Sequence, residues 1–286
     1  MDIQKDIEKP EEIKKDFLNI QKIFYTKSPA LAKMVPKFVY NYLKRIIHES
    51  ELNELFYNNK DKFDFDLVNS ILEGFQIKIN VKGLENVPST GRYIIASNHP
   101  LGGFDGLALM SVVGKIRKDI VFPVNDLLMN LPNIKGLFIP INKHGSNAEN
   151  VKIINDTFAS DVMILFFPAG LVSRKQSGKI LDLEWKKTFI TKAKRFKRDI
   201  IPTFIDGRNS NFFYNFANLR KFLGIKTNIE MLYLSDEIFK QKNKTINIVF
   251  GKPIPYSKFD KTNSDQKWAE FVKQQAYSLE NNILQS

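Results

Sequence analysis

RYIIASNHPLGGFDG, residues 92–106, carries the chain from an apolar run into a turn with one proline and three glycines. A short apolar run that ends in such a turn is typical of a buried strand followed by an irregular loop. We expect a helix over residues 103–115 to follow this loop. The unit would place Asn98 and His99 at the carboxyl end of a strand, where open α/β sheets bind ligands.

Similar short apolar runs recur along the chain and alternate with helical segments. The runs are QIKINVKG (76–83), DIVFPV (119–124), GLFIPIN (136–142), VMILFFP (162–168) and DIIPTFID (199–206), and further helices are expected over 146–159, 184–197, 209–222 and 263–283. This alternation predicts an α/β domain with a mixed, largely parallel sheet flanked by helices. No repeat or linker interrupts the pattern, so we place this domain at residues 76–286.

Residues 1–75 are predicted to form an N-terminal helical subdomain. In LAKMVPKFVYNYLKRII, residues 31–47, apolar residues recur at helical spacing, and Pro36 is expected in the first turn of a helix. The opposite side of this helix carries Lys33, Lys37, Lys44 and Arg45. Such a helix either lies in a membrane interface or packs on its own domain, and the pattern alone leaves both possibilities open.

The composition narrows the class of protein. The chain has 286 residues, a formal net charge of +12 and no cysteine. The charge favours polyanionic partners, meaning nucleic acid, anionic lipid or phosphate-bearing substrates, and the lack of cysteine excludes disulfides and thiolate nucleophiles. The N-terminus lacks the pattern of a secretory signal, and no apolar run approaches the roughly 20 residues that cross a bilayer. We expect a cytoplasmic protein that meets membranes peripherally.

His99 and Asp105 are the candidate catalytic pair. A carboxylate that accepts a hydrogen bond from one imidazole nitrogen raises the basicity of the other, which can then take a proton from a hydroxyl. Without cysteine or a Gly-x-Ser-x-Gly elbow, we expect that hydroxyl to belong to the substrate. The alternative is that Asp105 only caps the following helix and His99 only bonds within its loop.

A second block, ILFFPAGLVSRKQSGKILDLEW (164–185), ends an apolar strand at a glycine turn and then clusters cations. Because arginine grips phosphate or carboxylate through parallel hydrogen bonds, Ser173, Arg174 and Lys175 predict an anion site. Asp182, Glu184 and Trp185 follow this loop and are expected to hold it in place, with the alternative that Glu184 only caps the helix that begins there.

In this order, the two blocks resemble the glycerolipid acyltransferase superfamily, which is marked by Asn-His-x4-Asp and then Phe-Pro-Glu-Gly-x-x-Ser-Arg. The resemblance covers about residues 76–255 and includes weaker matches at GLFIPINK (136–143) and DIIPTFIDG (199–207). It implies that His99, oriented by Asp105, is the general base for an acceptor hydroxyl that attacks the thioester of acyl-CoA or acyl carrier protein. It also implies substrate-binding roles for Asn98, Gly102, Gly103, Lys143, Pro168, Gly170, Ser173, Arg174 and Lys175. Backbone amides of the glycine turn are expected to stabilise the oxyanion.

Two departures from the family pattern bear on the acceptor. Five residues rather than four separate His99 from Asp105, and Ala169 stands where the family has glutamate. Both features, with the N-terminal segment, resemble a bacterial branch often labelled hemolysins, which includes enzymes that O-acylate lyso-ornithine and lyso-glycine lipids. The resemblance therefore favours a lyso-amino-acid lipid as acceptor. The alternatives are a 1-acylglycerol-3-phosphate acyltransferase and a non-catalytic lipid-binding protein on the same fold.

Other partners are less well supported by the sequence. The charge and the 24 phenylalanines would suit a nucleic-acid-binding protein, but most phenylalanines lie in apolar strand and helix stripes, so we expect no nucleic acid. Three scattered histidines and the lack of a phosphate-binding glycine loop predict no metal site and no bound cofactor besides the acyl donor. The basic surface and the N-terminal helix are expected to dock the protein on the anionic inner face of the cytoplasmic membrane.

Overall fold

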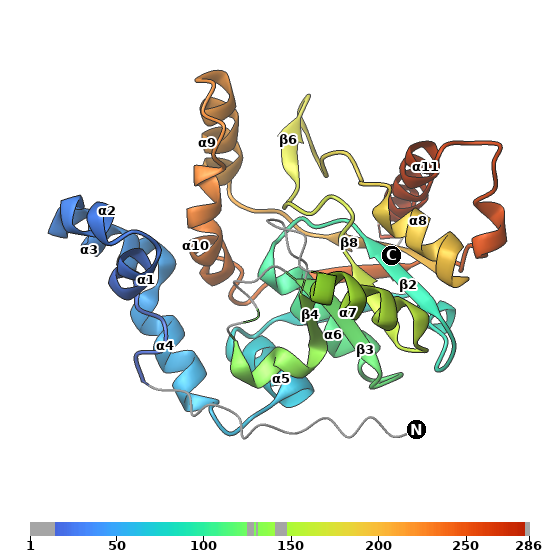
Figure 1. The fold of residues 1–286 in the computed structure, drawn as a ribbon, viewed down its shortest axis with the longest axis horizontal. Helices are drawn as coiled ribbons and strands as arrows, with labels where there is room; N and C mark the ends of the chain where they lie inside the picture. Colours follow the sequence, from blue (N-terminus) through green and yellow to red (C-terminus); the bar gives the residue numbers. More distant parts are fainter. Residues whose placement is uncertain (1–14, 125–128, 130, 141–147, 284–286) are drawn as a thin grey trace.

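The computed structural model describes residues 15–124, 129, 131–140 and 148–283, and its centre is a seven-stranded sheet (Figure 1). The strand order is β1-β9-β8-β2-β5-β3-β4. Strands β8, β2, β5, β3 and β4 are parallel, whereas β9 is antiparallel to β8 and pairs with β1 in parallel. The strands are β1 (Lys78–Lys82), β2 (Tyr93–Ser97), β3 (Ile120–Val124), β4 (Phe138–Pro140), β5 (Met163–Phe166), β8 (Asp199–Asp206) and β9 (Thr245–Phe250). The predicted mixed, largely parallel sheet flanked by helices is confirmed.

Helices cover both faces of this sheet, which explains why its strands are unbroken apolar runs. On β2, Ile94 is in register with Ile164 of β5 and Ile200 of β8, and all three face α8 (Thr188–Phe196) and α11 (Asp265–Ser278). The next residue of each strand points the other way, toward α5 (Asp64–Gly74) and α6 (Gly103–Val113). Successive residues of each central strand thus bury aliphatic side chains on opposite faces of the sheet, and this requirement sets the register of the strands.

The helices predicted after residue 100 are present at their expected places. They are α6, α7 (Ala148–Ala159), α8, α9 (Asn211–Phe222) and α11. The sequence interpretation missed β9, the short helix α10 (Leu234–Phe239), and a hairpin of β6 (Arg174–Gln176) and β7 (Lys179–Leu181). The two hairpin strands have three residues each and α10 has six, so their local pattern is weak. Strand β9 is different, because its run TINIVF is as long and as apolar as the runs that predict the other strands.

The N-terminal segment forms α1 (Ile20–Lys27), α2 (Pro29–Met34), α3 (Lys37–Ile47) and α4 (Glu49–Asn58). Pro36 has an extended backbone just before α3 and separates it from α2. Tyr40, Leu43 and Ile46 of α3 are buried in a cluster that includes Tyr233, so part of this apolar face packs on the domain. Helix α5, within the predicted subdomain, instead belongs to the core under the sheet. None of the described helices is long and apolar enough to cross a membrane.

Arg198 ties together the strand ends opposite the site. Its guanidinium is fully buried and donates hydrogen bonds to main-chain carbonyls that close α7 and precede or begin β5 and β2. The acceptors are the carbonyls of Tyr93, Thr157, Phe158, Ser160 and Val162. Burial lowers the pKa of Arg198 to about 10, which still leaves it charged at neutral pH. Main-chain carbonyl dipoles therefore stabilise this buried charge, and the nearby carboxylate of Asp161 adds to them.

Replacing Arg198 tests this arrangement. Arg198→Met would leave several buried carbonyls without donors, and we expect it to lower the free energy of unfolding by about 3–5 kcal/mol. The exposed Arg195→Met, three residues away, should change it by less than about 0.5 kcal/mol. Urea denaturation of both variants measures the difference, and equal effects would contradict the role given to Arg198.

Candidate active site

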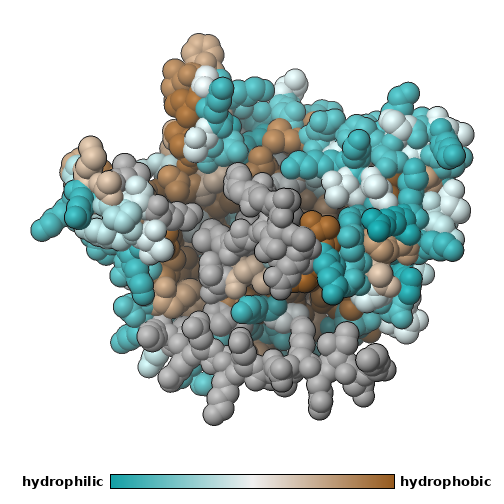
Figure 2. All heavy atoms as spheres, in the orientation of Figure 1, coloured by the Kyte–Doolittle hydropathy of each residue, from teal (hydrophilic) through white to brown (hydrophobic). Residues whose placement is uncertain are grey.

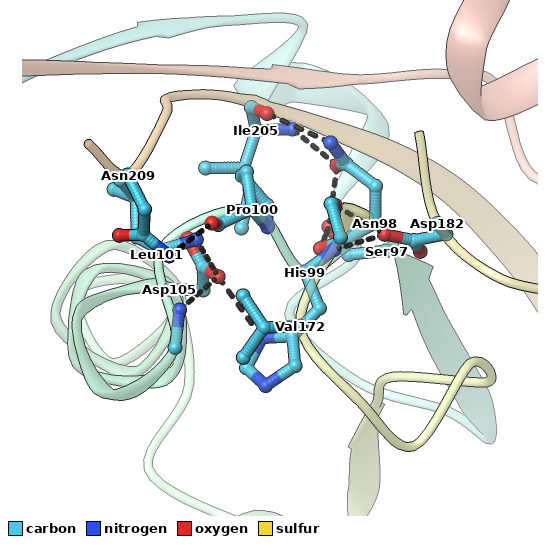
Figure 3. A network of polar contacts seen from close by, with 12 residues as sticks. Ser97, Asn98, His99, Pro100, Leu101, Asp105, Val172, Asp182, Ile205 and Asn209 are labelled. Carbon is cyan, nitrogen blue, oxygen red and sulfur yellow. Dashed lines mark hydrogen bonds and ion pairs between the residues drawn. The ribbon is translucent and has the colours of Figure 1, made fainter. Parts of the chain in front are cut away.

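The turn after β2 brings His99 and Asp105 together as predicted (Figure 3). His99 Nδ1 lies 2.9 Å from Asp105 Oδ2, and the second ring nitrogen points away from the carboxylate. The Asp105 side chain is fully buried, whereas 18% of the His99 side chain is exposed. Gly102 has φ +89°, a conformation that a side chain would strain, and this lets the longer loop return the carboxylate to the ring.

Asp105 also caps α6, so the two alternative roles considered for it occur together. Its Oδ2 accepts hydrogen bonds from the backbone N–H groups of Leu101 at 2.8 Å and Gly102 at 3.0 Å. Because these amides already bind Asp105, they are not available to an oxyanion, which corrects the expected role of the Gly102 amide. Gly103, the first residue of α6, is exposed.

The electrostatics of the pair follow from its burial. Burial raises the pKa of Asp105, and the hydrogen bonds from His99, Leu101 and Gly102 oppose this rise. Its other oxygen, Oδ1, has no hydrogen-bond partner among the described residues. An ionised Asp105 can only accept, so Nδ1 of His99 carries the ring proton and Nε2 is left with a lone pair. The pair can therefore act as a general base at Nε2.

Hydrogen bonds join the turn to strand β8 and to the segment that follows it. Asn98 is buried, and its side-chain amide donates to Ile205 O and accepts from Ile205 N at 2.8 and 2.7 Å. Asn209 donates to Pro100 O at 3.1 Å. Gly207 lies so close to Leu101 that a Cβ would come within 2.7 Å of the leucine side chain. Asn98, predicted to bind substrate, is thus placed where it positions His99.

Asp182 anchors the second block to the backbone of His99. Its Oδ1 accepts from His99 N at 3.1 Å and from the Ser173 hydroxyl at 2.5 Å, and its Oδ2 accepts from Trp185 Nε1 at 2.7 Å. In return, Ser173 N donates to His99 O at 2.8 Å. Asp182 and Trp185 hold this loop as predicted, whereas Glu184 is exposed and α8 begins only after Lys187. The predicted ligand Ser173 is itself buried in the same network.

Phe167 is a site residue that the sequence interpretation missed. Its ring stacks on His99 with centroids 4.0 Å apart and an angle of 18° between the planes. Phe122 packs in turn on Phe167 at 4.9 Å. Phe167 therefore covers one face of the imidazole, and Asp105 binds its Nδ1, so both fix the orientation of the ring. No polar signal marks Phe167, because it is one residue of an apolar strand run.

The predicted anion-binding residues have different surroundings. Arg174 is buried, and its Nη2 lies 2.8 Å from Glu230 Oε1, while Arg220 Nε lies 2.7 Å from the other carboxylate oxygen. Lys175, the next residue, is half-buried, and no described side chain pairs with its ammonium. Lys143 lies outside the described residues.

The remaining turn residues frame the loop. Pro168 is buried and its carbonyl accepts from Lys186 N at 3.1 Å, while Gly170 is exposed with φ +65°. Ala169, in place of the family's glutamate, is buried in the apolar cluster with Trp185 and Phe189. A carboxylate there would be buried among apolar side chains, so position 169 does not face substrate in this chain. No group of three or more metal-ligating side chains occurs among the described residues.

The raised pKa of Asp105 predicts a pH-dependent stability. Folding favours its protonated form, so its contribution to stability is complete below the ordinary pKa of 3.8 and is lost as pH rises through the raised value. Asp105→Asn removes this loss, so the unfolding free energy of wild type minus variant should fall as pH increases above 4. Urea unfolding across pH measures it. Asp156 is exposed, so Asp156→Asn is the control, and its unfolding free energy should change with pH as that of wild type does. If the difference between wild type and Asp105→Asn did not change with pH, the burial argument would be wrong.

Comparisons with known proteins show the family of this chain. A family model described as acyltransferase matches residues 22–285. The lyso-glycine lipid O-acyltransferases of Bacteroides thetaiotaomicron and Phocaeicola vulgatus are each 49% identical to this chain over 264 residues, covering 92% of it and 97% and 95% of the relatives.

Among solved structures, the 1-acyl-sn-glycerophosphate (LPA) acyltransferase PlsC from Thermotoga maritima aligns with a TM-score of 0.46 and 16% identity, over 90% of this chain and 89% of that one. The family match spans most of the chain, including both sequence blocks and every described residue of the His99–Asp105 turn. The chain therefore belongs to the acyltransferase family, within the glycerolipid acyltransferase superfamily, and is an acyltransferase.

Proposed function

We propose that this acyltransferase moves a fatty acyl group from the thioester of acyl-CoA or acyl carrier protein to the hydroxyl of a lyso-lipid. The observation that carries the mechanism is the His99–Asp105 pair, whose unpaired ring nitrogen faces away from the carboxylate. The names of the 49% identical relatives support a lyso-amino-acid lipid, and a lyso-glycine lipid in particular, as the acceptor.

The reaction needs no protein nucleophile. His99 Nε2 takes the proton from the acceptor hydroxyl as the oxygen attacks the thioester carbonyl, and Asp105 stabilises the imidazolium that forms. The tetrahedral intermediate then breaks its carbon–sulfur bond, and the leaving thiolate takes the proton from His99. The products are an ester and a free thiol.

The acceptor's negative charge has to be met by a cation near this turn. Glu230 neutralises the buried Arg174, and position 169 faces the core. Lys175 follows Arg174 directly and has no described acidic partner, so we assign it the acceptor's carboxylate. Lys143 remains a second proposed contact. A 1-acylglycerol-3-phosphate acceptor is the alternative, since the same cation can bind phosphate.

The acceptor lipid also sets where the enzyme works. We place it peripherally on the inner face of the cytoplasmic membrane, because the net charge of +12 favours anionic headgroups. This attraction should weaken as added salt screens the surface charges.

Lys175 and Arg174 can be separated by experiment. Lys175→Ala should raise KM for the acceptor about tenfold and leave the free energy of unfolding unchanged, because it loses one charge-assisted contact. Arg174→Met should lower the free energy of unfolding by about 1–3 kcal/mol, because the buried Glu230 loses one of the two arginines that pair with it and keeps Arg220. Steady-state kinetics and urea unfolding measure both. An unchanged KM in the lysine variant would remove Lys175 from the acceptor site.

His99→Ala tests the proposed function as a whole. Purified wild type and variant are incubated with labelled acyl-CoA or acyl carrier protein and a panel of lyso-lipids, and acyl transfer is scored by mass spectrometry. We expect wild type to acylate a lyso-amino-acid lipid and His99→Ala to be slower by about a thousandfold, because the general base is lost. His48→Ala changes a histidine that bonds Glu51 and Asp236 away from this site, so it should retain transfer.

The other outcomes each exclude one part of the proposal. Transfer only to lysophosphatidate would overturn the acceptor but not the chemistry. Wild-type rates in His99→Ala would overturn the catalytic base. Folded, lipid-bound wild type that transfers to no acceptor would favour the non-catalytic lipid-binding protein.

A further inference from the structure

Helix α9 connects the active-site turn to a protruding edge of the molecule. It begins two residues after Asn209, whose side chain binds Pro100 beside the catalytic histidine. Twelve helical residues extend about 18 Å, and Figure 1 shows α9 rising away from the sheet to the top of the view. The far end of α9 is therefore held at a set distance from His99.

That far end exposes a cluster of apolar side chains that we call the α9 tip. It comprises Leu219, Phe222, Leu223 and Ile225, with exposed fractions of 52%, 86%, 60% and 39%. Figure 2 shows hydrophobic residues gathered along this upper edge. The packed face of α9, which includes Phe213 and Tyr214, is fully buried. The tip is thus an unpartnered extension of a well-packed helix, and clusters of this kind mark interaction sites.

The charges around the tip identify the partner. Residues 207–229 contain four cations and no acidic residue. Lys221 and Lys226 flank the tip and are exposed, whereas Arg220 is engaged with Glu230. Exposed apolar side chains with two lysines beside them and no acidic residue in the same stretch suit the interface of an anionic bilayer. A second copy of the chain would instead bring like charges together, so self-association through this tip is disfavoured.

A second exposed apolar site lies on the N-terminal helices and is linked to α9. Met34 and Phe38, 79% and 72% exposed, lie beside lysines at 33 and 37. Met34 ends α2, and Phe38 lies on α3. Also on α3, the Tyr42 hydroxyl bonds the Tyr233 hydroxyl, and the Tyr233 ring packs edge-on against Phe212 of α9 at 5.0 Å. Figure 1 shows the helices α2 and α9 on the side of the molecule away from α11. The two sites can therefore contact one surface together.

We propose that the α9 tip inserts into the interfacial layer of an anionic bilayer and, with Met34 and Phe38, docks the enzyme there. This inference rests on the proposed function, because docking brings the enzyme to its acceptor only if that acceptor is a lyso-lipid in the bilayer. It adds a docking element, α9, that the N-terminal pattern does not contain. The turn that carries His99 would then lie one length of α9, roughly 18 Å, from the bilayer surface.

The test compares two matched double variants of the full chain. Phe222→Ser with Leu223→Ser removes the most exposed part of the tip, and Val151→Ser with Ile153→Ser removes exposed apolar side chains of α7. Sedimentation with phosphatidylcholine vesicles that contain phosphatidylglycerol measures partitioning. Because burying each large apolar side chain is worth about tenfold, we expect the tip variant to bind about a hundredfold more weakly and the α7 variant to bind like wild type. Both variants should keep wild-type rates on a short-chain acceptor dissolved below its micellar concentration.

Several outcomes would overturn the inference. Wild-type partitioning by the tip variant would exclude insertion, and equal wild-type binding to pure phosphatidylcholine would exclude the anionic headgroup requirement. A wild-type dimer that becomes monomeric in the tip variant, with vesicle binding unchanged, would assign the tip to self-association. The proposed function fails separately: wild type that binds vesicles through the tip and acylates no acceptor would refute the function and leave the docking surface standing.

Discussion

The fully buried carboxylate of Asp105 is the constraint around which the active-site turn is built. A charged oxygen inside a protein needs donors, and Oδ2 finds three of them within 3.0 Å: His99 Nδ1, Leu101 N and Gly102 N. To bring Asp105 Oδ2 to these three donors, the chain has to fold back at Gly102 and begin α6 immediately afterwards. One carboxylate therefore starts a helix, closes a turn and orients the histidine.

The turn is rigid because distant segments bind its backbone rather than its reactive edge. Asp182 holds the His99 N–H, Asn98 joins the turn to β8, and Asn209 holds Pro100 O. Phe167 covers one face of the imidazole. These contacts hold the backbone of the turn and leave Nε2 of His99 unbonded among the described residues, which is how a scaffold preorganises a base.

Charge is distributed in two ways across the molecule. Buried cations are matched within the fold: Arg198 by peptide carbonyls and Arg174 by Glu230. Other cations, such as Lys175 in the second block and Lys221 at the α9 tip, have no acidic partner among the described residues. The net charge of +12 is therefore informative only once the paired cations have been set aside.

The amino-acid sequence by itself determined every strand of the sheet except β9, the order of the helices that flank it, and the pairing of His99 with Asp105. Each of these depends on residues that are close in the chain: apolar runs of strand length, and a six-residue turn whose glycines allow the return. Only the tertiary structure decided that Arg174 is neutralised 56 residues away by Glu230, that Asp182 reaches across 83 residues to His99, and that Ala169 faces the core. It also decided which apolar side chains of α3 and α9 stay exposed. Burial and pairing of this kind depend on contacts between distant segments, and local patterns do not encode those contacts.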